Sequence, residues 1–165
     1  IMSSLSSSVP ILINILPNVY WLYNINNSPN TLNTSGLQNF KIEIKKKTEL
    51  LGIHTLLELD DKLAFWGKSK EYTNEIRVEL EKEEFAKLSF LFKKINDFIK
   101  NAYINNQPIL ITTYKYDYLD VGIALWAYFF HINANIPYDV IIKLLSLKII
   151  GNIVLSDNIK KFFSF

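Results

Sequence analysis

The sequence predicts a single α/β domain with a central, mostly parallel sheet flanked by helices and a helical C-terminal third. Segments with strand-like patterns alternate with segments of helical periodicity through the first two thirds of the chain, and helical patterns follow one another after residue 119. The 165 residues suit one domain with a hydrophobic core, and no internal repeat indicates a second one.

Four segments have the composition of β-strands. Asn18–Ile25 is aromatic and β-branched, and Glu75–Leu80 alternates apolar with polar residues. "QPILIT", residues 107–112, is almost wholly apolar, which is typical of a strand buried on both faces. Ile53–Leu59 is the remaining strand, and Lys62–Tyr72 is expected to be a loop that holds at most a short strand around Leu63–Trp66.

Five helices are expected between and after these strands. The clearest is Glu83–Ala102, whose apolar residues form one continuous stripe. The others are a helix that starts near Leu37 and ends at Gly52, then Asp120–Asn133, a helix with Pro137 in its first turn and a last one capped by Ser156. The serine-rich residues 1–15 are expected to be a flexible tail, which leaves residues 16–165 as the domain.

Composition excludes several kinds of chemistry. The chain has no cysteine, so it has no thiolate nucleophile, thiolate zinc site or disulfide. His54 and His131 lie in separate elements without ligand spacing, so we expect no metal and no cofactor. A net charge of +2 gives no reason to expect nucleic-acid binding. The longest apolar run, Val121–Phe130, is shorter than the ~20 residues of a membrane span, so we expect a cytoplasmic protein.

The candidate site is the loop within "ILITTYKYDYLDVGIALWAYFF", residues 109–130. A strand, a tight loop and a helix often form an anion-binding cradle, and α/β sheets place ligands at the carboxyl ends of their strands. This loop nevertheless contains no glycine, cysteine, histidine or arginine. The residues in question are Thr112, Thr113, Tyr114, Lys115, Tyr116, Asp117, Tyr118, Leu119 and Asp120.

From about Leu16 onward, the chain resembles the dual-specificity branch of the protein tyrosine phosphatases. "LPNVYWLYN" is similar to the opening strand of that family, and "ELLGIHTLLELDD" to its helix-to-strand passage. "PILITTYKYDYLDVGIALWAYFF" resembles, without a gap, the block "VLVHCxxGxxRSxTxxxAYLM" that contains the family's phosphate loop. "NIPYDVIIKLLSLKIIGN" resembles the helix that follows. The resemblance implies a dual-specificity phosphatase-like fold.

The same resemblance implies that the catalytic groups are missing. The family attacks phosphorus with a cysteine thiolate and holds the phosphoryl oxygens with an arginine. Thr113 stands at the cysteine position, Leu119 at the arginine position and Tyr116 at a glycine position. Asp120 replaces a hydroxyl residue and adds negative charge. The general-acid segment Glu79–Lys82 offers glutamates but no aspartate.

Two interpretations of the loop side chains stay open at this stage. Thr113 could serve as a nucleophile only with an adjacent base, whereas Thr112 and Thr113 are also typical of the end of a strand. Tyr114, Tyr116 and Tyr118 could form an aromatic contact surface or fill the space that a phosphate would occupy.

We therefore expect a pseudophosphatase, not an enzyme, that acts by binding a protein partner of unknown identity. It would be a regulator or a structural part of a larger assembly. The residue bias indicates an AT-rich coding genome, such as that of a large DNA virus or of certain protists, and in the viral case the protein would be virion-associated. The alternative is a divergent phosphatase or an RNA 5′-triphosphatase-like enzyme with an unrecognised nucleophile.

Overall fold

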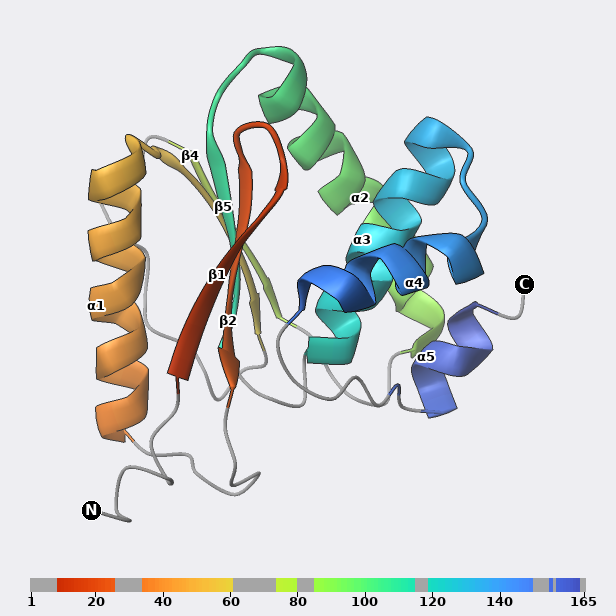
Figure 1. Ribbon diagram of the computed structural model, residues 1–165, viewed down its shortest axis with the longest axis horizontal. Coiled ribbons are helices and arrows are strands. Elements are labelled where there is room, and N and C mark those ends of the chain that lie inside the picture. Colours follow the sequence, from red (N-terminus) through yellow and green to blue (C-terminus); the bar gives the residue numbers. More distant parts are fainter. Residues whose placement is uncertain are drawn as a thin grey trace.

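A five-stranded sheet separates two helical layers (Figure 1). The structure, a computed structural model, describes residues 9–25, 34–60, 74–79, 85–114, 119–149, 155 and 157–163. Within these ranges, α1 covers one face of the sheet, and α2, α3, α4 and α5 cover the other. This arrangement confirms the predicted α/β domain with a helical C-terminal third.

The sheet has the strand order β1-β2-β5-β3-β4. Its strands are β1 (Val9–Leu16), β2 (Val19–Ile25), β3 (Thr55–Asp60), β4 (Asn74–Glu79) and β5 (Ile109–Thr113). β1 runs antiparallel to β2, whereas β2, β5, β3 and β4 are parallel neighbours, so the sheet is mostly parallel as predicted. All five residues of β5 are buried, and this strand is central, as its continuous apolar pattern predicted.

The expectation of a flexible tail over residues 1–15 is wrong for residues 9–15. They belong to β1, which pairs with β2 from Val9 opposite Ile25 to Leu16 opposite Val19. Pro10 and Asn14 interrupted the apolar run, but an edge strand tolerates proline because one row of its backbone groups has no ladder partner. Asn18, at φ 65°, turns the chain between the two strands. Residues 1–8 lie outside the described part of the chain.

The helices are α1 (Thr34–Leu51), α2 (Phe85–Ile104), α3 (Leu119–Ala134), α4 (Tyr138–Lys148) and α5 (Asp157–Phe162). α1 ends where the sequence predicted, because Gly52 adopts φ 65° and the amide of Ile53 donates a 2.8 Å hydrogen bond to the carbonyl of Thr48. Asn133 of α3 donates a 2.7 Å side-chain hydrogen bond to Asn96 of α2. The short strand expected around Leu63–Trp66 lies outside the described residues.

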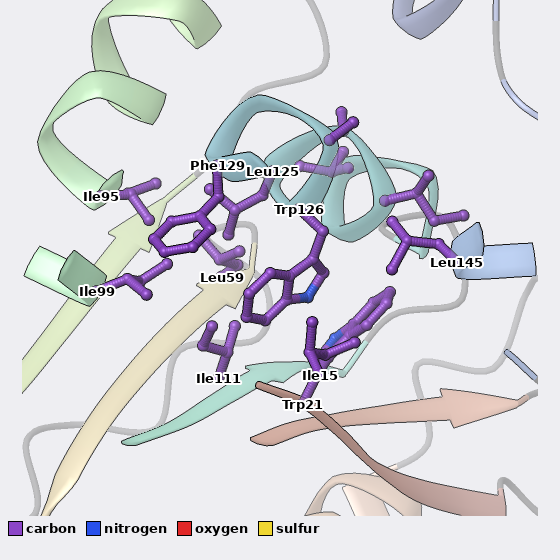
Figure 2. Packing of buried hydrophobic residues seen from close by; sticks show 14 of the residues in the cluster. Ile15, Trp21, Leu59, Ile95, Ile99, Ile111, Leu125, Trp126, Phe129 and Leu145 are labelled. Atoms are coloured by element: carbon purple, nitrogen blue, oxygen red, sulfur yellow. The ribbon is translucent and has the colours of Figure 1, made fainter. Parts of the chain in front are cut away.

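The core is divided by the sheet into two clusters. Under α1, Phe40 and Ile44 pack on Leu22, Leu56 and Leu110. The larger cluster joins the opposite face of the sheet to α2, α3 and α4; it includes Trp21, Leu59, Ile99, Ile111, Trp126 and Leu145 (Figure 2). Among the described helices, none is long and apolar enough to cross a membrane.

Candidate functional site

The candidate loop connects the central strand to α3. β5 ends at Thr113 and α3 begins at Leu119, so the predicted strand–loop–helix arrangement is present at the carboxyl edge of the parallel strands. Five of the nine predicted site residues are described: Thr112, Thr113, Tyr114, Leu119 and Asp120. The other four, Lys115, Tyr116, Asp117 and Tyr118, lie outside the described residues.

Thr112 and Thr113 finish the central strand and face opposite layers. Successive side chains of a strand alternate between its faces. Ile111 belongs to the cluster under α2 and α3, and Leu110 to the cluster under α1. Thr113 therefore faces the α2–α3 layer, and Thr112 faces α1. Both side chains are fully buried, so neither is presented to solvent as a reactive group would be.

The hydroxyl of Thr113 is held by a tryptophan from the neighbouring strand. The indole Nε1–H of Trp21 donates a buried hydrogen bond of 3.0 Å to Thr113 Oγ1. Trp21 is also fully buried, and its ring lies 4.9 Å from that of Tyr23. An indole N–H only donates and cannot take a proton from a hydroxyl. This contact therefore fixes Thr113 as an acceptor and does not activate it as a nucleophile.

The same indole touches the start of α3. A Cβ atom added to Gly122 would lie 2.2 Å from the Cζ2 atom of Trp21, so the helix backbone rests directly on the ring. Leu119, which stands at the arginine position of the resemblance, is buried in the same cluster. Trp21 thus occupies the space between the last residue of β5 and the first turn of α3. Sequence analysis missed this role of both Trp21 and Gly122.

Tyr114 is buried on the other side of the sheet. Its ring packs on Phe40 of α1 with a centroid distance of 5.3 Å. It therefore contributes to the core beneath α1 and does not form an exposed contact surface. Asp120 is half-buried in the first turn of α3, where a carboxylate complements the helix dipole.

Polar side chains also gather beneath α1 at this edge of the sheet. Thr112 lies opposite Glu58 in the register of β5 and β3, and Asn24 lies on the neighbouring strand β2. All three side chains are buried. Thr112 Oγ1 and Asn24 Oδ1 have no hydrogen-bond partner in the structure. The two threonines therefore differ: Thr113 makes a side-chain hydrogen bond, whereas Thr112 carries an unsatisfied oxygen.

Metal-ligating residues do not converge in the described part of the chain, where no group of three or more His, Cys, Asp or Glu side chains could hold an ion. His54 is exposed. His131 donates from Nδ1 to the carbonyl of Ile136 at 3.0 Å and stacks on Tyr138 at 4.1 Å, so its contacts position the turn before α4.

Comparison with known sequences gives no relative. A scan against protein families finds no match, and a search of curated proteins finds none either.

Comparison with solved structures identifies the fold. Human DUSP28 superposes with a TM-score of 0.64 at 10% identity over 96% of this chain and 94% of its own. The human tyrosine phosphatase-like serine/threonine/tyrosine-interacting protein gives 0.64 at 9% identity over 93% of each chain. A putative protein tyrosine phosphatase from Leishmania major gives 0.60 at 15% identity over 94% of this chain and 98% of its own. The chain therefore has the fold of the dual-specificity phosphatases.

Replacing Thr113 by valine should destabilise the protein. The change keeps the shape of the side chain but leaves the buried Trp21 N–H without an acceptor, which costs about 2 kcal/mol of unfolding free energy. The matched control is Thr112→Val, which removes an oxygen that has no partner and should be neutral or slightly stabilising. Urea denaturation of both variants measures the difference. Equal stabilities would contradict the asymmetry between the two threonines.

Replacing Gly122 by alanine should also destabilise the protein. Alanine is normally favoured over glycine inside a helix by about 1 kcal/mol, but here its Cβ would overlap the buried indole. Overpacking of a core costs up to about 3 kcal/mol, so after the gain in helix propensity the protein should lose about 2 kcal/mol of unfolding free energy. Gly52→Ala is the control: it meets no atom within 4 Å and should cost only about 1 kcal/mol through its positive φ. If Gly122→Ala melted at or above the melting temperature of the wild type, the close contact between Gly122 and Trp21 would be contradicted.

Proposed function

We propose that this chain is a catalytically inactive protein with a phosphatase fold that acts by binding another protein. The observation that carries the proposal is the hydrogen bond from Trp21 to Thr113. The hydroxyl of Thr113, at the position of the family's nucleophile, is buried and accepts this hydrogen bond. A threonine nucleophile must lose its proton to a base, and the indole N–H is not one.

The position of the phosphate clamp supports the same conclusion. Leu119 is apolar and packs into the core, where a guanidinium would be costly to bury. The absence of cysteine from the sequence removes the thiolate mechanism altogether. A divergent phosphatase or RNA 5′-triphosphatase would have to use a different nucleophile, and none of the described loop residues offers one.

The proposed role is that of a regulator or a structural part of a larger assembly, such as a virus particle. One structural neighbour is named a phosphatase-like interacting protein, which supports the idea that this fold can serve in recognition. Affinity purification from native material would separate the two roles, since a structural part has a partner in fixed stoichiometry.

The purified protein should not hydrolyse aryl phosphates, phosphopeptides or 5′-triphosphorylated RNA. Phosphate and vanadate should not raise its melting temperature. A site with a dissociation constant of about 1 mM would add about 1.8 kcal/mol to the free energy of unfolding at about 20 mM phosphate. In a protein of this size, that would raise the melting temperature by about 5 °C. A shift of that size, or turnover that scales with enzyme concentration, would overturn the proposal.

Introducing the missing nucleophile should not restore activity. In Thr113→Cys the thiol would lie in a fully buried strand position beside Trp21, where burial disfavours the thiolate. We expect no phosphatase activity and slow modification by a thiol reagent until the protein is unfolded. Leu50→Cys, at a position 77% exposed on α1, is the control that should react at once. Phosphatase activity in Thr113→Cys would show that a working cradle survives.

A further inference from the structure

α4 carries an apolar stripe on its outer side. Val140, Leu144 and Leu147 are 41%, 53% and 83% exposed, and their spacing of four and three residues places them on one face. The opposite face, with Ile141 and Leu145, is buried against the core. α4 packs on α3 at the surface of the helical layer (Figure 1). The helix is therefore apolar on both sides, although only one side is covered.

A cavity adjoins this stripe. It has a volume of about 350 Å³, and its lining is almost entirely apolar. Ile15 and Leu16 from the β1–β2 hairpin form one wall, and Phe130 and Ile136 contribute from the end of α3 and the turn that follows. Leu144 and Leu147 belong to both the lining and the stripe. A protruding apolar ridge and a hollow therefore lie side by side on one surface.

The charges beside the stripe have both signs. Asp139 and Lys143 are exposed and four residues apart, so they share one flank of α4. When two copies of a helix pair antiparallel about a two-fold axis, each flank meets the same flank in reverse order. When the axis crosses the helix pair near Ile141, Asp139 of one copy lies opposite Lys143 of the other, and the reverse contact is made at the same time. The two helix dipoles also run in opposite directions, which is favourable.

We propose that the surface formed by α4 and the adjoining cavity binds a second copy of this chain in a two-fold symmetric dimer. A two-fold interface requires a surface that is complementary to itself, and a ridge beside a hollow meets that requirement. The charged residue that lines the cavity is Lys148, whereas the other flank of the stripe carries both signs in Asp139 and Lys143, and this mixed flank favours a second copy. This interface is independent of the inactive loop, which lies at the carboxyl edge of the sheet.

Sedimentation equilibrium of the purified chain between about 1 and about 200 μM tests the proposal, and a reversible monomer–dimer equilibrium is expected. Leu147→Asp should raise the dissociation constant at least tenfold, because it places a carboxylate in an apolar contact. The control is Leu50→Asp, equally exposed but on α1 across the sheet, which should leave the equilibrium unchanged. Both positions are exposed, so neither change should prevent folding, which circular dichroism verifies.

A charge exchange tests the antiparallel arrangement. Asp139→Lys and Lys143→Asp each turn two attractive contacts into repulsive ones and should weaken the dimer about tenfold. The double variant restores opposite charges across the two-fold axis and should recover the wild-type dissociation constant.

A monomer at every concentration, a dimer that survives Leu147→Asp, or a double variant no tighter than the single ones would overturn the proposal. A monomer that binds an acidic peptide through this groove would overturn it in favour of a different occupant. Turnover of a phosphate ester would contradict the proposed inactive function and leave the dimer unaffected, so the two failures can be told apart.

Discussion

The buried indole of Trp21 connects the sheet to the helix that follows the candidate loop. Its N–H needs an acceptor, which Thr113 supplies from the end of the central strand, and its ring needs room, which Gly122 supplies from α3. Trp21 lies far from both Thr113 and Gly122 in the sequence, yet each of the three restricts the other two. Among the described residues at this edge of the sheet, the large aromatic side chain of Trp21 fills the space between the end of β5 and the first turn of α3.

Most of the fold could be predicted from the sequence because periodic patterns decided it. The continuous apolar run of β5 is typical of a buried strand, and the apolar stripe of α2 is typical of a helix with one buried face. Gly52 indicated the end of α1, because a helix often ends at a residue with positive φ and glycine adopts that conformation without strain. β1 was missed because proline and asparagine interrupt a short apolar run beside a serine-rich segment. Its strand character comes from pairing with β2, a tertiary contact that local propensity does not encode.

The position of the candidate loop was predictable, but the contacts of its described side chains were not. Strand–loop–helix order located the loop, and the sequence of the loop contains neither cysteine nor arginine. The contact between Trp21 and Thr113 spans 92 residues and leaves no local signal. The one available hint was Gly122, since a glycine inside a helix is costly and usually indicates a close approach. Nothing in the sequence pointed to a tryptophan from β2 as the neighbour.

The two faces of β5 differ in how they bury polar groups at this edge of the sheet. Active sites keep polar groups and strain that lower stability in return for function. On the α2–α3 face, the polar group of Thr113 is satisfied and the surrounding space is packed. On the α1 face, Thr112 and Asn24 bury unsatisfied oxygens, so burial there carries a cost in unfolding free energy that no described hydrogen bond offsets. An exposed apolar stripe lies on α4, which packs on α3 in the helical layer. A stable monomer would not need such an exposed apolar stripe, and the proposed dimer would cover it.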